Sequence, residues 1–287
     1  MTTLQPKTAL VDAHVHVHAA FDPDRFLSGA LEGFRRGAAA AGIAAPFTGC
    51  LLLAESAGER WFRQAAGSGA AGSWRLEPTA EPESLRARRP DGAELVVIAG
   101  RQVRTREGLE VLALATAEDF ADGLPLAETL DRVRASGALP VLPWGFGKWW
   151  FSRGALVAAE LGSGRGELYL GDNAGRPTRF GRPRLFREAA ERGVPVLAGS
   201  DPLPLAGHGT RAGSYGFLLA GPLDEAQPAR SLAALVRRLR AAGAQPRPFG
   251  RTSGLLRFCR DQAALRLSRR GGAAPGAVSP VSPGWRP

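Results

Sequence analysis

The sequence has few of the residues that hold small secreted proteins together. Its 287 residues include only two cysteines, Cys50 and Cys259, which are too few for a disulfide framework and have no metal-binding spacing. No uncharged apolar run reaches the roughly 18 residues that a membrane span needs, and the N-terminus shows no charged segment followed by an apolar one. We therefore expect a cytoplasmic protein in a reducing compartment, without a membrane segment.

Lysine is almost missing as well. The chain has 37 basic and 27 acidic residues and a formal net charge of +10, yet Lys7 and Lys148 are its only lysines. Such a charge suits nucleic acid, a membrane surface or a small anionic substrate. The basic residues are dispersed and do not alternate with aromatic rings, which favours a solvated arginine-rich surface over a nucleic-acid groove. Lys148 is then notable, because an amine is kept where arginine serves almost everywhere else.

Histidine is the third scarce residue, and its distribution is uneven. Three of the four histidines, His14, His16 and His18, alternate near the N-terminus, and the fourth, His208, follows Asp201. In an extended strand, residues two apart share a face, so Asp12 and the three histidines are expected to form one polar row opposite an apolar row of Val11, Ala13, Val15 and Val17. Imidazoles at the end of a core strand are well placed to hold a divalent cation. The alternative is a set of hydrogen-bonded structural histidines.

The whole chain, with 44% hydrophobic and 22% charged residues, has the composition of a folded globular protein. Its pattern predicts main strands at residues 8–17, 47–54, 138–143, 167–170, 195–198 and 214–219. It predicts helices at residues 25–41, 59–66, 125–135, 153–161, 183–192, 228–242 and 254–269. Residues 67–116 contain shorter strand-like pieces at 74–77, 85–88, 94–103 and 109–115, which indicate hairpins with at least one insertion. This alternation favours a βα barrel.

We expect residues 1–270 to form a single domain and residues 271–287, rich in Pro, Gly and Ala, to form a disordered tail. In a βα barrel the polar residues at the carboxyl ends of the strands converge on one face. Here those ends carry the three histidines, Glu55, Lys148, Asp172 with Asn173, and Asp201. Their convergence would make a pocket, although Glu55 alone could be a loop carboxylate and Asp172 a helix cap.

These residues resemble a known family. Asp12-x-His14-x-His16 on a first strand, a late strand ending in Gly199-Ser200-Asp201, and the segment from Gly100 to Leu114 are similar to the polymerase and histidinol phosphatase (PHP) superfamily and, more distantly, to the amidohydrolases. The resemblance implies an α/β fold, a distorted TIM-like (β/α)7 barrel. The sequence pattern adds a small hairpin insertion and two C-terminal helices to this barrel. The resemblance also implies one to three divalent metal ions at the carboxyl face and hydrolysis of phosphoesters.

The chain departs from the PHP pattern at several positions. Glu55-Ser56 stands where the family has an Asp-His pair, Gln102 stands where a metal-bridging glutamate is usual, and the final Asp-x-His is stretched to Asp201 and His208. Histidines expected on the middle strands are missing. We therefore expect one metal ion rather than a full cluster.

Together these observations predict a metal-dependent hydrolase that acts on a phosphoester or another small anionic substrate. We expect His14, His16 and Asp201 to bind zinc or manganese, or iron, with His208 or Glu55 completing the ligand set. Asp201 or Asp172 would be the base, and Lys148 would be catalytic or bind substrate. Substrate anions could also contact the following residues: His18, Arg101, Arg176 and Arg211.

Two other classes remain open at this stage. Lys148 at the end of a middle strand is also similar to the metal-bridging lysine of amidohydrolases, which would imply hydrolysis of a C–N bond. Gln102 and the missing histidines would suit a catalytically decayed barrel that only binds an anionic metabolite. Nucleic-acid binding through the arginine-rich helices after Pro228 ranks last.

Overall fold

The computed structural model describes residues 8–43 and 46–270. Its strands form two mixed sheets. The first has eight strands in the order β13 (Arg247–Gly250), β12 (Tyr215–Ala220), β1 (Thr8–Val15), β2 (Phe47–Leu53), β6 (Glu94–Ile98), β5 (Ser84–Arg88), β4 (Trp74–Pro78) and β3 (Ala70–Ala71). The second has five strands in the order β11 (Val196–Gly199), β10 (Tyr169–Asn173), β9 (Leu139–Pro143), β8 (Glu110–Leu114) and β7 (Gly100–Arg104).

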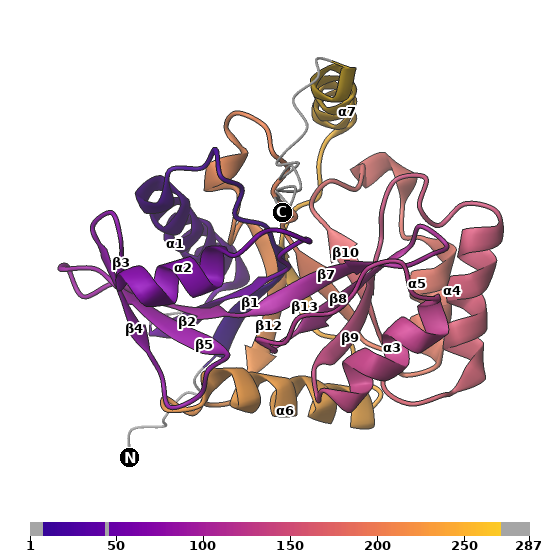
Figure 1. Ribbon diagram of the computed structural model, residues 1–287, viewed down its shortest axis with the longest axis horizontal. Coiled ribbons are helices and arrows are strands. Elements are labelled where there is room, and N and C mark those ends of the chain that lie inside the picture. Colours follow the sequence, from indigo (N-terminus) through magenta and orange to yellow (C-terminus); the bar gives the residue numbers. More distant parts are fainter. Residues whose placement is uncertain (1–7, 44–45, 271–287) are drawn as a thin grey trace, which may run out of the picture.

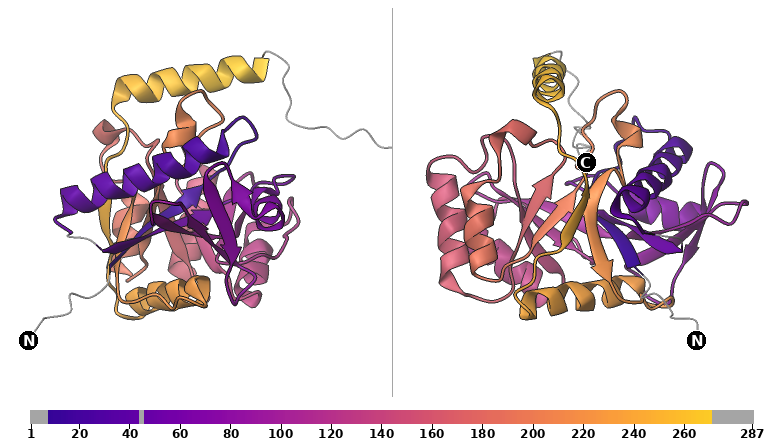
Figure 2. Two further views of the ribbon diagram at one scale, coloured as in Figure 1. Left: turned by 90° about the vertical axis from the view of Figure 1, so that its left-hand side faces the viewer. Right: turned by 180° about the vertical axis from the view of Figure 1, so that it is seen from behind.

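Helices cover the outer faces of both sheets. α1 (Pro23–Ala41) and α2 (Trp61–Ser68) lie on the side of the first sheet, and α3 (Leu126–Ala135), α4 (Ser152–Ser163) and α5 (Arg184–Glu191) lie on the side of the second (Figure 1). α6 (Pro228–Ala241) crosses one end of the molecule and α7 (Leu255–Arg270) lies beyond the other (Figure 2). In the residues described, no helix is both long enough and apolar enough to cross a membrane.

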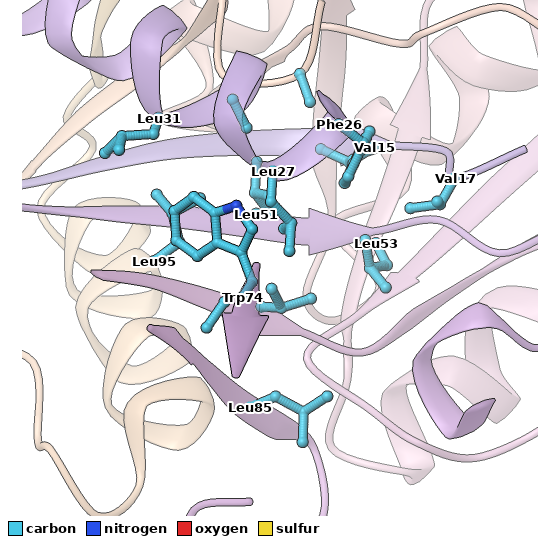
Figure 3. Close-up of a cluster of buried hydrophobic side chains, with 14 of the residues drawn as sticks. Val15, Val17, Phe26, Leu27, Leu31, Leu51, Leu53, Trp74, Leu85 and Leu95 are labelled. Carbon is cyan, nitrogen blue, oxygen red and sulfur yellow. The ribbon is translucent and has the colours of Figure 1, made fainter. Parts of the chain in front are cut away.

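The core is divided among these layers. Leu27 and Leu31 of α1 pack with Leu51, Trp74 and Leu95 of the first sheet (Figure 3). A second cluster contains side chains from both sheets and from α6, among them Leu52, Ile98, Leu112, Val141 and Leu232. A third joins the second sheet to α3, α4 and α5. The arrangement is a flattened α/β fold with the two sheets sharing an inner core.

The predicted closed (β/α)7 barrel is therefore wrong. A barrel needs one continuous ladder of strands. In the described residues, parallel ladders join only β1–β2–β6 and β9–β10–β11, and the other parallel pairs are the isolated bridges Glu55–Arg101 and Pro177–Ser253. The expected strand at 94–103 bends at Ala99, and its two halves, β6 and β7, pair in different sheets. The hairpins expected as an insertion extend the first sheet through β3, β4 and β5. The described part of the chain thus has no closed barrel.

The edges of the two sheets approach each other at two places. On one side the Asp201 N–H donates to the His14 carbonyl at 2.8 Å, and on the other the Glu55 N–H donates to the Gly100 carbonyl at 3.1 Å. A Cβ at Gly100 would lie 2.3 Å from the Leu53 carbonyl oxygen, so only glycine allows this approach. Short contacts between sheet edges therefore bring the ends of β1, β2, β7 and β11 together.

Most of the predicted elements are present close to their expected bounds. β13 was not predicted, because Arg247–Gly250 contains a proline and few apolar residues. Two 3-10 turns, η1 (Thr178–Phe180) and η2 (His208–Thr210), were not predicted either. The predicted disordered tail, 271–287, lies outside the described residues.

Candidate metal centre

The three N-terminal histidines follow an irregularity in β1. The register of β1 with β2 shifts between Asp12 and Val15. Val11 and Ala13 pack in the inner core, whereas Val15 packs with Leu10 on the α1 side. The alternation has therefore slipped by one residue, as in a β-bulge. The single polar row expected from the sequence is broken, and Asp12 does not share a face with the histidines.

Asp12 instead holds the backbone around the site. Its buried carboxylate accepts hydrogen bonds from the N–H groups of Ser200 at 2.7 Å, Gly213 at 2.8 Å and His14 at 3.3 Å. Burial raises the pKa of Asp12 to about 7, against the opposing effect of these hydrogen bonds. Asp12 thus joins β1 to the end of β11 and to the segment before β12.

Asp201 reaches the histidines because the end of β11 has an unusual backbone. Asp201 has a φ of +47°, a left-handed conformation that costs a non-glycine residue about 1–3 kcal/mol. Just before it, a Cβ at Gly199 would lie 2.4 Å from the His14 backbone nitrogen. Only glycine lets β11 pass so close to β1. The strained turn that follows directs the Asp201 carboxylate toward the histidine rings.

His14, His16 and Asp201 form the group best suited to hold a metal ion. The two histidine Nε2 atoms are 3.1 Å apart, and Asp201 Oδ1 lies 3.7 Å from His14 Nε2 and 3.8 Å from His16 Nε2. The three potential ligand atoms all lie within 4.8 Å of one another. Two imidazole nitrogens and a carboxylate oxygen match the ligands that zinc takes in proteins. The structure therefore brings together the three residues predicted as core ligands.

Glu59, which the sequence analysis missed, lies beside the Nδ1 atoms of His16 and His18. Its Oε2 lies 3.7 Å from His16 Nδ1 and its Oε1 lies 3.2 Å from His18 Nδ1. Its Oε2 also accepts a hydrogen bond from the Ser56 N–H at 2.7 Å. A carboxylate on the second nitrogen of a histidine fixes the ring and leaves the first nitrogen for a metal. The only sequence signal was the Ser-x-x-Glu spacing of Ser56 and Glu59, which is typical of a helix capping box.

His18 lies beside this carboxylate rather than in the ligand group. Its Nε2 is 2.9 Å from the Pro202 carbonyl oxygen, and its Nδ1 faces Glu59. These contacts connect the end of β1 to the residue that follows Asp201. His18 also lines the cavity described below, so a contact with substrate stays a prediction.

The electrostatics of the cluster favour a positive charge between its carboxylates. Burial lowers the pKa of His14, which keeps its ring neutral as a ligand must be. Burial acts the same way on His16, but Glu59 and Asp201 outweigh it and raise the pKa of that ring. The pKa of Asp201 is lowered despite burial, because His14, His16 and Lys148 lie close.

A cavity of about 480 Å³ opens onto the three residues. Lys148 and Arg211 line it, as predicted for groups that would meet an anion. Lys148 Nζ forms an ion pair with Glu110, a second lining carboxylate that the sequence analysis missed. The neutral Gln102 also lines the cavity. Predicted groups for cation and anion binding thus share one space.

Other predicted site residues lie in separate ion pairs. Glu55 accepts hydrogen bonds from Arg101 Nη1 at 2.7 Å and from the Phe62 N–H at 2.7 Å, at the start of α2. Arg101 also pairs with Asp119 at 2.6 Å. The structure does not bring Glu55 into the ligand group or Arg101 into the lining of the large cavity.

Asp172 and Arg176 form another closed pair. Both carboxylate oxygens of Asp172 accept hydrogen bonds from Arg176, at 2.7 and 2.8 Å, and Oδ2 also accepts one from the Tyr215 hydroxyl at 2.8 Å. The neighbouring Asn173 donates to the Trp144 carbonyl at 2.7 Å and does line the cavity. Asp172 is therefore occupied with structural partners, and neither it nor Arg176 lines the cavity.

His208 belongs to a buried cluster that anchors α7. Its Nε2 lies 3.3 Å from Asp261 of α7, its Nδ1 accepts from the Leu203 N–H at 3.0 Å, and Arg211 Nη1 lies 3.4 Å from the same aspartate. His208 is not in the ligand group with His14 and His16. The predicted roles of Glu55 and His208 as completing ligands find no support in these positions.

Comparison with known proteins identifies the fold alone. No protein-family model and no curated protein sequence matches the chain. The structure is similar to the crystal structure of PsfC from Pseudomonas syringae PB-5123, with a TM-score of 0.53 and 12% sequence identity, over 92% of this chain and 99% of PsfC. The resemblance to the PHP superfamily stays a prediction.

Proposed function

We propose that the protein is a metal-dependent hydrolase whose substrate is a small anionic molecule, a phosphoester in the first place. The observation that carries the proposal is the convergence of His14 Nε2, His16 Nε2 and Asp201 Oδ1 within 4.8 Å at the base of a cavity. The strained backbone at Asp201 and the Glu59 carboxylate beside His16 are typical of functional sites rather than of ordinary core packing.

The residues present fit a divalent cation. The two Nε2 atoms lie 3.1 Å apart. His16 Nδ1 is buried without a hydrogen-bond partner and lies 3.7 Å from Glu59 Oε2. A proton on that Nδ1 would leave the Nε2 lone pair free for the cation. Zinc or manganese suits this mixture of nitrogen and oxygen donors, and iron is a third candidate.

When bound, such an ion would activate a water molecule for attack near neutral pH. The side chains supply the remaining functions. The Asp201 carboxylate would serve as the proton acceptor, because the other predicted base, Asp172, has both oxygens bonded to Arg176 and Tyr215. Lys148 and Arg211 line the same cavity and bind the anionic group of the substrate.

Metal analysis of the full-length protein, purified without chelator, tests the proposal. About one zinc, manganese or iron ion per chain is expected, together with hydrolysis of simple phosphate esters. The double variant His14→Ala/His16→Ala should lose both metal and turnover. His208→Gln is the matched control, because it changes a histidine outside the cluster and should retain metal. The proposal is overturned if the wild-type protein holds no metal and its melting temperature is unchanged by added zinc or manganese.

A further inference from the structure

The cavity over the metal centre has an aromatic side. Besides the polar groups already described, its lining includes three rings, Trp144, Phe146 and Phe258, and the side chains of Leu203 and Leu265. A site that handled only a bare oxyanion would need polar donors and no such surface. These side chains are available to contact a second, apolar part of a ligand.

Phe146 is held in place by other rings. Its ring centroid lies 4.9 Å from Phe258 and 5.0 Å from Trp150, both edge to face, and 6.1 Å from Phe180. These rings come from three segments: the loop between β9 and α4, the turn η1, and α7. Edge-to-face contacts of this kind favour one geometry. The aromatic surface is therefore fixed before any ligand arrives.

α7 closes this part of the cavity. Phe258, Gln262 and Leu265, spaced four and three residues apart, put one face of α7 against the cavity. The helix lies at the end of the molecule away from α6 (Figure 2). Asp261 anchors it through His208 at 3.3 Å and Arg211 at 3.4 Å. Arg211 therefore connects the anion-binding side of the cavity to the helix that carries the aromatic side.

We infer that the substrate carries an aromatic group next to the anionic group held at the metal centre, as in an aryl phosphoester. The inference rests on the proposed function, which defines the anionic end. The cavity of about 480 Å³ has room for such a ligand, since pockets of roughly 300–1,000 Å³ take organic ligands. The most exposed ring nearby, Phe151, which is 91% exposed, does not line the cavity.

Titration calorimetry with two non-hydrolysable probes tests the inference. Full-length protein loaded with zinc is titrated with phenylphosphonate and with methylphosphonate, which share the anionic group and differ in the apolar one. Phenylphosphonate should bind at least about tenfold more tightly, because a phenyl ring gains from burial against Phe146 and Phe258. Equal affinities overturn the inference.

Variants locate the preference in the aromatic surface. Phe146→Ala and Phe258→Ala should each reduce the preference for phenylphosphonate by about threefold or more, with methylphosphonate affinity unchanged. Phe146→Leu keeps the fold if the alanine variant does not, and it should retain only part of the preference. Phe151→Ala is the matched control and should bind like the wild type. If Phe151→Ala weakens phenylphosphonate binding as much as Phe146→Ala does, the aromatic surface named here is not the site.

The outcomes separate the inference from the proposed function. Preference for phenylphosphonate without hydrolysis of any ester would support the aromatic site and overturn the hydrolase. Hydrolysis of phenyl phosphate and glycerol phosphate with the same kcat/KM would support the hydrolase and overturn the aromatic preference. Binding of neither phosphonate by metal-loaded protein overturns the inference, whatever the metal content.

Discussion

The candidate metal centre and the Asp172 pair both lie where strands of the two sheets end, but their polar atoms are used differently. In the candidate metal centre, the potential ligand atoms of His14, His16 and Asp201 lie close together beside a cavity. Asp172 instead uses both oxygens to bind Arg176 and Tyr215. The Glu55–Arg101 pair and the His208–Asp261 cluster resemble the second case. The same kind of residue at the same kind of position can thus support either binding or stability.

The two regions differ in whether the charge of their buried carboxylates is balanced inside the protein. A buried carboxylate paired with a guanidinium has its charge balanced inside the protein. The centre at His14 and His16 has the carboxylates of Asp201 and Glu59 beside it, and they raise the pKa of His16 against the effect of burial. A cation would complete the balance there, whereas Asp172 needs none. This contrast suggests opposite responses to substitution.

The largest difference is expected between Asp172→Ala and Asp201→Asn. Asp172→Ala leaves the partly buried Arg176 and the buried Tyr215 hydroxyl without their carboxylate partner. It should lower the free energy of unfolding by about 1–3 kcal/mol, while zinc still binds. Asp201→Asn should weaken zinc binding at least about 100-fold, because it removes a charged ligand. Its effect on the chelator-treated protein should stay below about 1 kcal/mol, since asparagine also tolerates positive φ.

Urea unfolding in the presence of chelator and zinc titration of both variants give the comparison. If Asp172→Ala loses zinc while Asp201→Asn retains it, the assignment of binding and structural roles must be reversed.

A smaller loss of zinc affinity is expected on substitution of Glu59, which tests whether its carboxylate orients His16. Glu59→Gln removes the charge facing His16 Nδ1 and should weaken zinc binding by about 10- to 100-fold, the usual range for such partners. Glu55→Gln is the matched control, because Glu55 binds Arg101 and the start of α2 instead. Its zinc affinity should stay within about twofold of wild type, with a loss of stability of about 1–3 kcal/mol. A zinc affinity that falls equally in both variants would restore Glu55 as a candidate ligand.

The smallest effect concerns His208 and pH. Burial, with the nearby Arg211 adding to it and Asp261 opposing it, lowers the pKa of His208 in the folded protein to about 4. An exposed imidazole has a pKa of about 6.5, so the unfolded chain takes up this proton first as the pH falls. The contribution to stability is therefore fully present above about pH 6.5 and is lost as the pH falls toward 4.

Between pH 7.5 and 5.5, this group should reduce the free energy of unfolding by about 1 kcal/mol. The difference between wild type and His208→Gln in chelator-treated samples isolates it from other titrating groups. Parallel stability curves for the two proteins across this range would show that His208 is not held neutral.

Much of the secondary structure could be predicted from local patterns. The start of α1 at Pro23 follows Asp22, whose side chain accepts from the Arg25 N–H at 2.8 Å, as the Asp-Pro sequence suggests. The apolar run from Phe47 to Leu53 is a buried strand. The barrel was wrong because strand pairing is a long-range property. The bend at Ala99, which sends β6 and β7 into different sheets, has no local signal stronger than a single Ala-Gly step.

The candidate site was predictable in part for a related reason. The scarcity of histidine pointed to His14 and His16, and the apolar strand before Gly199-Ser200-Asp201 pointed to Asp201, so three ligand candidates could be named before their distances were known. Glu59 and Glu110 could not be assigned to the site. The capping-box spacing of Ser56 and Glu59, and the place of Glu110 in the Gly100–Leu114 segment, do not separate a site carboxylate from a structural one. Their roles come from packing against residues far away in the sequence.

The sequence by itself determined which residues can do chemistry here, because residue type sets charge, donor atoms and local strand or helix preference. It also made the approach of β11 to β1 possible, since glycine at position 199 leaves room for the His14 backbone. Only the tertiary structure decided which polar groups form ion pairs and hydrogen bonds with each other and which face a cavity. That choice depends on pairing between distant strands, such as the bond from Asp201 to His14 across 187 positions of the chain, and on the bulge in β1 that separates Asp12 from the histidines.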